Sequence, residues 1–172
     1  MNIRFSTERL NIADMTLSDC DYAAAAWSDD EAGKYLLDDK YENGDALRLI
    51  LSPILSASPT DDFYFTVWDK DCRNICGTAC AFRDEGDVWG IGYTVNKLMW
   101  GKGLGTELVG GLCLFCREMG AKYVHADVFL ENTASMKVCI KNGFEPHRES
   151  IEQKRGTDIT YKTITMRKAL NA

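Results

Sequence analysis

The residues most suggestive of chemistry form a loop with three alternating glycines, Trp100-Gly101-Lys102-Gly103-Leu104-Gly105-Thr106-Glu107. Glycine allows positive backbone angles and close approaches that a Cβ would block. The loop leads into a predicted helix, whose first N–H groups lack intrahelical acceptors and whose positive dipole end attracts anions. This combination indicates a binding site for a phosphate or pyrophosphate group. A flexible connection, or glycines that only let the helix pack tightly, would leave the same pattern.

Two known phosphate-binding patterns differ from this loop. A Walker A loop carries its lysine after the last glycine, followed by serine or threonine, whereas Lys102 lies between two glycines. A dinucleotide-binding loop is closer, because Asp127 lies 22 residues after Gly105, where an acid could bind a ribose. In that pattern the glycines directly follow a strand, however, and here residues 96–100 intervene. We therefore exclude the first pattern and keep dinucleotide binding as an alternative.

Asn132 and Ser135 lie at the next predicted junction between a strand and a helix. An asparagine at this point is typical of a helix N-cap. A serine three residues later falls in the first helical turn, where its hydroxyl usually bonds the backbone. The residues alone therefore favour structural roles for both.

The seven cysteines are an odd number in apolar surroundings, which favours reduced thiols over a disulfide framework. Cys72, Cys76 and Cys80 are evenly spaced, and Cys113 with Cys116 forms a CxxC pair. Structural zinc usually takes its ligands from turns, whereas these cysteines fall mostly in a predicted strand and on the apolar face of a predicted helix. We therefore predict no metal site.

The elements that must position these residues follow from hydrophobic periodicity and turn residues. The predicted strands are Glu8–Met15, Phe63–Trp68, Ile75–Phe82, Val88–Val95, Tyr123–Phe129, Phe144–Ile151 and Ile159–Met166. The predicted helices are one with Ser18 as N-cap that runs to Trp27, Asp45–Leu55 with a kink or an end at Pro53, Gly105–Met119 and Thr133–Asn142. An antiparallel meander that feeds a strand–loop–helix–strand crossover predicts a mixed sheet with helices on its faces, an α/β or α+β fold.

Length and charge limit the classes of partner. The chain has 172 residues, which fits one domain over residues 1–172. A net charge of −6 argues against a broad electropositive surface, so we expect no nucleic-acid partner. No apolar run approaches the roughly 18–20 residues of a membrane span, and the N-terminus is too charged for a signal peptide, so we expect no membrane partner and a cytoplasmic location. Both a monomer and a homodimer remain open.

Several motifs resemble the GNAT superfamily of acyl-CoA-dependent N-acetyltransferases. Val95–Thr106 is similar to the pyrophosphate loop of that family, Gln/Arg-x-x-Gly-x-Gly/Ala, with Trp100 in the position of Gln or Arg. Trp-Gly-Lys-Gly resembles the ribosomal-protein alanine acetyltransferase (RimJ/RimL-like) branch. Further similarities to this branch are Thr7-Glu8-Arg9-Leu10, Ile91-Gly92-Tyr93, Asn132-Thr133-Ala134-Ser135 and Lys141-Asn142-Gly143-Phe144. The resemblance covers nearly the whole chain and is most specific from Gly90 to Phe144.

The resemblance implies a mixed, mostly antiparallel central sheet with helices on both faces. In that fold Val88–Val95 splays from Tyr123–Phe129 and opens a cleft for acetyl-CoA, the implied cosubstrate. The backbone around Val95 would bind the pantetheine arm, and the amides from Trp100 to Thr106 would bind the pyrophosphate. The implied CoA-binding residues are Tyr93, Val95, Trp100, Gly101, Lys102, Gly103, Leu104, Gly105, Thr106, Asn132 and Ser135.

The implied reaction is direct transfer of an acetyl group to a primary amine, without a covalent intermediate. Many family members place a tyrosine seven residues after the asparagine as the acid for the departing thiolate, but here that position is Cys139. Ser135 is therefore the predicted catalytic residue, with Cys139 or water as alternatives. The candidates for a general base are Asp29, Asp30, Glu31, Asp87, Tyr93, His125, His147 and a chain of water molecules.

The acceptor amine is not apparent from the residues. A protein N-terminus, a polyamine or a small-molecule amine would each fit, and the negative net charge favours a cationic one. Two alternatives to an acetyltransferase remain at this point. One is a CoA-binding sensor without turnover, and the other is a dinucleotide-binding protein.

Overall fold

The aromatic and β-branched runs of the sequence form one continuous sheet. The computed structural model describes residues 1–37, 40–57 and 60–170. Within them the strands are β1 Ile3–Ser6, β2 Leu10–Asp14, β3 Asp62–Asp69, β4 Ile75–Glu85, β5 Val88–Val95, β6 Tyr123–Phe129, β7 Glu145–Gln153 and β8 Thr160–Ala169. They lie in the order β1-β2-β3-β4-β5-β6-β8-β7. Neighbouring strands are antiparallel, except that β5 and β6 are parallel. The predicted mixed, mostly antiparallel sheet is confirmed.

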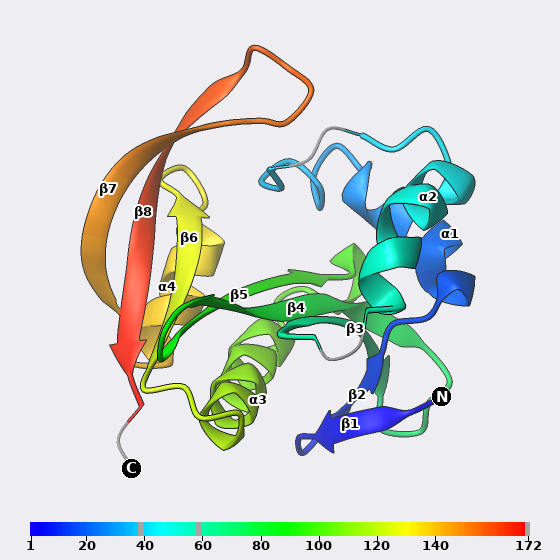
Figure 1. Ribbon diagram of the computed structural model, residues 1–172, viewed down its shortest axis with the longest axis horizontal. Coiled ribbons are helices and arrows are strands. Elements are labelled where there is room, and N and C mark those ends of the chain that lie inside the picture. The colour runs from blue at the N-terminus through cyan, green and yellow to red at the C-terminus, as the bar shows by residue number, and fades with distance from the viewer. Residues whose placement is uncertain (38–39, 58–59, 171–172) are drawn as a thin grey trace.

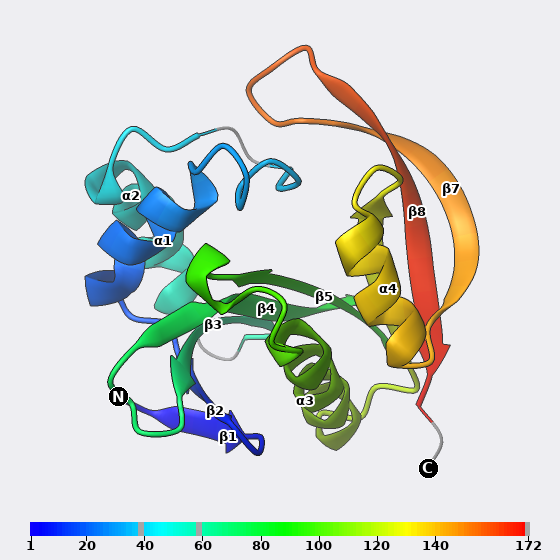
Figure 2. The ribbon, with the colours of Figure 1, turned by 180° about the vertical axis from the view of Figure 1, so that it is seen from behind.

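Helices cover both faces of this sheet, as predicted (Figures 1 and 2). The α-helices are α1 Cys20–Trp27, α2 Gly44–Leu55, α3 Leu104–Glu118 and α4 Thr133–Lys141. The buried face of α3 carries Leu108 and Leu112 and packs with Phe65 and Trp89 of the sheet in the main core. A second apolar cluster joins α1 and α2 on the opposite face, around Leu47. The helices thus bury the apolar stripes that the sequence periodicity indicated.

Strands β5 and β6 pair over only a short distance. Their register runs from Val88–Tyr123 to Gly90–His125 and ends there. Beyond that point β5 stays paired with β4 as far as Val95, and β6 stays paired with β8 as far as Phe129. The two strands therefore diverge toward their carboxyl ends, which confirms the predicted splay.

The N-terminal region differs from prediction in its local structure. Strand β1 was missed, because its short run gains stability by pairing with β2 and not by its own propensity. Ser18 was predicted as an N-cap, but a 3₁₀ turn over Leu17–Asp19 precedes α1 instead. Asp19 Oδ2 accepts hydrogen bonds from the Thr16 N–H and hydroxyl at 2.8 and 2.9 Å. This local pair of bonds explains why α1 begins at Cys20, one residue later than an N-cap at Ser18 implied.

The remaining boundaries agree with prediction within a few residues. Helix α2 continues through Pro53 and ends at Leu55, so the proline lies in the last turn. The hairpin of β7 and β8 is longer than predicted, and its tip reaches the loop that follows α1 (Figure 1), where the Arg155 N–H donates to the Leu37 carbonyl at 2.7 Å. Across the described ranges, no helix is long and apolar enough to cross a membrane.

Candidate active site

A cavity of about 540 Å³ lies between the end of β5 and the start of α4, where β5 and β6 diverge. Its walls come from the loop after α1, the end of β5, the glycine loop and α4. Every predicted CoA-binding residue except Lys102 lines this cavity, namely Tyr93, Val95, Trp100, Gly101, Gly103, Leu104, Gly105, Thr106, Asn132 and Ser135. The fold thus brings together two motifs that are far apart in the sequence.

The glycine loop has the backbone conformation that its sequence indicated. Gly101 and Gly103 have φ values of 76° and 78°, in the left-handed region that favours glycine. A Cβ on Gly101 would meet nothing within 4 Å, so the surface beside the loop is open. Gly103 is the N-cap of α3, so the amides of the first helical turn have no intrahelical acceptor. These features fit an anionic group such as the pyrophosphate of CoA.

The positive charge at the cavity comes from different lysines than predicted. The Lys102 ammonium turns back and donates to the Leu98 carbonyl at 3.1 Å, and Lys102 does not line the cavity. Lys137 and Lys141, one turn apart on α4, do line it. Sequence reasoning missed both, although their spacing on one face of the helix after Asn132 could have indicated them.

Trp100 replaces the polar residue that the loop motif usually carries at this position. Its indole N–H donates to the Val95 carbonyl at 2.7 Å, and the residue is 48% exposed. This hydrogen bond connects the last residue of β5 to the glycine loop. The substitution therefore keeps a donor at this position and directs it to the backbone.

Tyr93 and Ser135 meet across the cavity. The Tyr93 hydroxyl donates to Ser135 Oγ at 3.4 Å, so a hydrogen bond joins β5 to α4. Burial raises the pKa of Tyr93 to about 12, because it disfavours the charged phenolate. The phenol therefore stays protonated at neutral pH. Tyr93 makes a polar contact in the cavity as well as packing against the core.

Asn132 caps α4, as the residues alone predicted. Its Oδ1 accepts a hydrogen bond from the Ser135 N–H at 3.1 Å. Cys139, the alternative proton donor, is fully buried in the main core and does not line the cavity. Burial also raises the pKa of the Cys139 thiol to about 11. The geometry therefore favours Ser135 over Cys139 as the donor that faces the cavity.

Two candidate bases near the cavity share one cation. Lys97 lies 2.9 Å from Glu31 Oε2 and 3.3 Å from Asp29 Oδ2. Backbone hydrogen bonds from Ala32 and Glu31 lower the pKa of the Asp29 carboxyl. Glu31 lines the cavity, whereas Asp29 does not. Lys97 therefore offsets one of the two negative charges, and the group of three keeps a net charge of −1.

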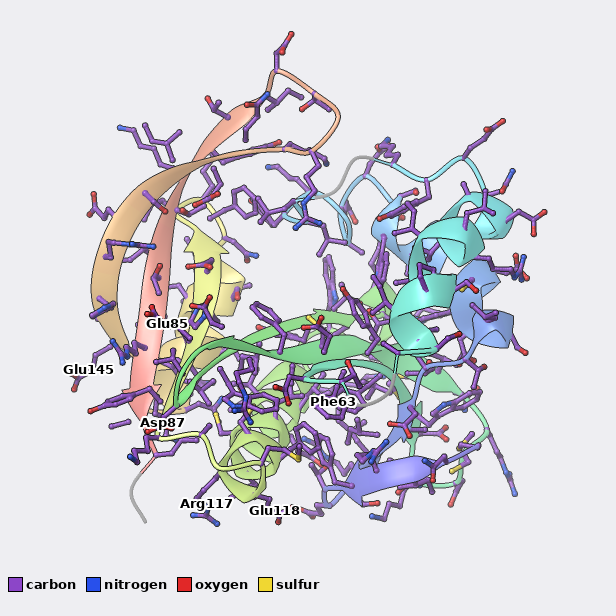
Figure 3. The ribbon with its side chains drawn as sticks, in the orientation of Figure 1. Phe63, Glu85, Asp87, Arg117, Glu118 and Glu145 are labelled. Atoms are coloured by element: carbon purple, nitrogen blue, oxygen red, sulfur yellow. The ribbon has the colours of Figure 1, made fainter. Side chains whose placement is uncertain are left out.

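The other candidate bases, apart from Tyr93, lie outside the cavity. Asp30 pairs with Lys40, and Asp87 pairs with Lys122 at 2.7 Å. Asp87, labelled in Figure 3, lies in the turn between β4 and β5, at the opposite end of β5 from Val95. His125 on β6 is mostly buried, with its Nε2 3.3 Å from Asp84, and His147 lies on β7 beside Arg167. Neither histidine lines the cavity.

The structure bears on the two other kinds of site that the sequence raised, a dinucleotide site and a metal site. Asp127 was the acid that a dinucleotide site would use. It accepts a hydrogen bond from the hydroxyl of Thr165 on the neighbouring strand β8 at 2.5 Å, and it does not line the cavity beside the glycine loop. The sheet is also not doubly wound, so a dinucleotide site of the usual kind is not formed. Within residues 1–37, 40–57 and 60–170, no group of three or more His, Cys, Asp or Glu residues could hold a metal ion.

Comparisons with known proteins agree with this geometry. The chain is 29% identical over 147 residues to a protein of Bacillus licheniformis named "Uncharacterized N-acetyltransferase p20", covering 81% of this chain and 80% of that one. The fold of this chain is similar to that of spermidine N-acetyltransferase from Vibrio cholerae, solved in complex with CoA and spermine. The TM-score is 0.81 at 14% identity, and the match covers 93% of this chain and 95% of that one. The fold is also similar to a GNAT-family acetyltransferase from Bacillus anthracis, with a TM-score of 0.80, 20% identity, and 98% coverage of both chains. Residues 9–145 match the family described as the acetyltransferase (GNAT) domain. This chain therefore belongs to the GNAT family of acetyltransferases and is an N-acetyltransferase.

Proposed function

We propose that the chain, as a single domain over residues 1–172, binds acetyl-CoA in the cavity and transfers its acetyl group to a primary amine. One observation carries the proposal. A single cavity joins the glycine loop to the Tyr93–Ser135 pair at the point where β5 and β6 diverge. An anion-binding end and a set of hydrogen-bond donors therefore face the same space. The cavity also reaches the loop after α1, which leaves a second side for the acceptor.

The anion-binding end combines backbone N–H donors in fixed positions with two lysine ammonium groups. The free amides of the glycine loop and the first turn of α3 are fixed donors that suit a pyrophosphate. Lys137 and Lys141 add two ammonium groups from the facing helix. In a chain of net charge −6, such a local concentration of donors and cations favours an anionic ligand at this place.

The chain contributes orientation and hydrogen bonding to the chemistry. Acetyl-CoA, when bound, supplies an activated thioester carbonyl and a thiolate leaving group. Val95 ends β5 beside the cavity, and the Trp100 indole fixes its carbonyl. We infer that the backbone at this end of β5 orients the acyl group for attack, because β6 no longer pairs with it there.

Tyr93 and Ser135 would stabilise the negative charge that develops on the leaving sulfur. Because the Tyr93 hydroxyl donates to Ser135 Oγ, the Ser135 hydroxyl hydrogen is free to donate toward the cavity. A free thiol has a pKa of about 8.5, so complete proton transfer to its thiolate from a phenol with a pKa of about 12 would be uphill by about 5 kcal/mol. The pair therefore acts by hydrogen-bond donation, and the final proton comes from solvent.

Glu31 is the carboxylate among the predicted bases that lines the cavity, and it already pairs with Lys97. We infer that the amine enters neutral, that no side chain acts as a dedicated base, and that the nitrogen releases its proton to solvent after attack. In that case kcat/KM for the acceptor should rise about tenfold per pH unit until the pKa of the amine is reached. Glu31→Gln should change this profile by less than about threefold, since a paired surface carboxylate contributes little. A loss of the rising limb in Glu31→Gln would instead identify Glu31 as the base.

Cationic amines are the first acceptors to test. The net charge favours them, and the Vibrio cholerae structure is named for spermidine and contains spermine. A screen of polyamines, small-molecule amines and peptide N-termini, read by release of free thiol from acetyl-CoA, would identify the class. Thermal shift with acetyl-CoA, NAD and ATP should show stabilisation by acetyl-CoA alone. Binding without turnover on any amine would favour the CoA sensor, and a shift with NAD or ATP alone would overturn the proposal.

A further inference from the structure

The motif Thr7-Glu8-Arg9-Leu10 has no place in the chemistry described above, yet its side chains reach the glycine loop. We propose that Arg9, together with Glu107, fixes the glycine loop in the shape that binds the pyrophosphate of CoA. Arg9 is then a positioning residue for the cosubstrate. This inference rests on the proposed function, because it concerns the anion-binding end of the same cavity.

Four hydrogen bonds connect the motif to the start of α3. Arg9 Nη1 donates to the Lys102 carbonyl at 2.8 Å, and Arg9 Nε donates to Glu107 Oε2 at 2.6 Å. Glu107 Oε1 accepts from the Arg9 N–H at 2.7 Å and from the Thr7 hydroxyl at 2.6 Å. The guanidinium therefore bonds the loop backbone and the first-turn acid of α3 at once, which a lysine cannot reproduce with the same fork geometry.

The bond to Lys102 controls the direction of the next amide. In a trans peptide the carbonyl of one residue and the N–H of the next point to opposite sides of the chain. With the Lys102 carbonyl directed to Arg9, the Gly103 N–H must point away from Arg9. Gly103 lines the cavity, whereas Arg9 does not. Gly103, on one side of this peptide, has no Cβ to restrict its rotation, so the bond from Arg9 selects one orientation.

The bond to Glu107 removes an electrostatic conflict. Glu107 is an acid in the first turn of α3, where a negative charge competes with a bound anion for the positive end of the helix. Its side chain is only 15% exposed, so water screens it poorly. Burial would raise the pKa of Glu107, but hydrogen bonds from Thr7 and Arg9 outweigh this and leave the pKa lowered. The carboxylate is therefore charged at neutral pH, and Arg9 compensates it beside the pyrophosphate site.

The test compares ligands that do and do not carry the pyrophosphate. Arg9→Met should raise the Kd of CoA, measured by calorimetry, by about tenfold to a hundredfold, as expected for one charge-assisted contact. It should lower kcat/KM with acetyl-CoA by a similar factor. With S-acetylpantetheine, which lacks the pyrophosphate, kcat/KM should stay within about twofold of the parent. Arg9→Lys should recover less than half of the loss on a logarithmic scale, because it restores the charge without the fork.

Arg4→Met is the matched control. Arg4 pairs with Asp14 on the neighbouring strands through two hydrogen bonds of 2.9 and 2.7 Å, and neither residue lines the cavity. This variant loses an arginine ion pair of the same kind and should bind CoA as the parent does. Thermal unfolding of both variants separates any general loss of stability from a specific loss of binding.

The double variant Arg9→Met/Glu107→Gln tests whether Arg9 compensates the charge of Glu107. Removing the uncompensated carboxylate should restore about threefold or more of the CoA affinity that Arg9→Met loses. Arg9→Met that binds CoA as tightly as Arg4→Met would overturn the inference, and so would an equal loss with S-acetylpantetheine. If Arg9→Met does not fold, Arg9→Lys and Glu107→Gln give the same comparison. A parent protein that binds no CoA would overturn the proposed function and this inference together.

Discussion

At the residue scale, the site depends on hydrogen bonds whose partners are remote in the sequence. Tyr93 and Ser135 are 42 positions apart, and Thr7 and Glu107 are 100 positions apart. In the function proposed above, the first pair faces the reacting end of the cavity, and the second supports the anion-binding end. Each bond constrains one side chain whose freedom would otherwise weaken catalysis or binding.

Ser135→Ala should lower kcat by about 100-fold, the low end of the usual range for a positioned donor, with little change in acetyl-CoA affinity. The effect is modest because a thiolate is a tolerable leaving group near neutral pH. The N-cap bond survives the change, since Asn132 accepts from the backbone N–H of residue 135. Steady-state kinetics at a temperature where both proteins are folded would measure it.

Thr133→Ala is the control for this change, because Thr133 is exposed in the same helical turn and does not line the cavity. It should leave kcat unchanged. An unchanged kcat in Ser135→Ala as well would remove the hydroxyl from the chemistry, because the leaving sulfur would then need no hydrogen bond from Ser135.

At the element scale, α3 and α4 present the anion-binding end. The loop before α3 supplies amides, and α4 supplies lysines. Helix α3 is in turn placed by close contact with the N-terminal strands. A Cβ on Gly111 would lie 2.8 Å from Thr7 Cγ2 and 3.0 Å from Phe5 Cε2, so only glycine lets the segment carrying Arg9 approach α3 this closely.

Gly103→Val should weaken CoA binding by at least about tenfold, because a β-branched residue is strained at a φ of 78° and displaces the loop amides. Calorimetry with CoA measures the effect. Gly120→Val is the matched control, since Gly120 has a φ of 91° at the other end of α3, with open space around its Cβ position. Both variants should lose similar stability, and equal CoA affinity in the two would place the anion site elsewhere.

Lys137→Ala and Lys141→Ala should each raise KM for acetyl-CoA by about twofold to fivefold at low salt, since exposed charges contribute about 0.2–1 kcal/mol. The increase should shrink at high ionic strength, because salt screens exposed charges. Lys122→Ala removes an exposed lysine outside the cavity and should leave KM unchanged. A salt dependence of KM that is the same in the parent and in the double variant Lys137→Ala/Lys141→Ala would contradict this role.

At the scale of the whole molecule, the main core contains ionisable groups that must stay neutral. Burial raises the pKa of Cys113 to about 11 and that of Cys116 to about 12, and Tyr93 also reaches about 12. In the unfolded chain the pKa is about 8.5 for a thiol and about 10 for tyrosine. As pH rises, the unfolded chain therefore loses its protons first, and the native state loses relative stability.

The free energy of unfolding should be constant from about pH 7 to 8 and fall above about pH 9, by about 1.4 kcal/mol per pH unit for each group in its window. Urea unfolding at several pH values measures this slope. Cys116→Ala should be less stable at pH 7, because it leaves a cavity, but its stability should fall less steeply above pH 9. Parallel pH profiles for the parent and this variant would contradict the prediction.

Local features of the site were predictable from the sequence alone. The bounds of β5 and β6, the helix that starts at the glycine loop and the Asn132 cap all follow from backbone preferences over a few residues. The motifs also indicated the GNAT family, because their order along the chain matches its elements.

Only the tertiary structure decided which side chains share the cavity. It turned Lys102 toward Leu98, brought Lys137 and Lys141 to the anion-binding end, and placed Lys97 against Glu31. It also paired β1 with β2 and carried Arg9 to the glycine loop. These contacts depend on strand order and on the face that each side chain takes in the sheet. Both are set by long-range packing, which the local pattern of residues does not contain.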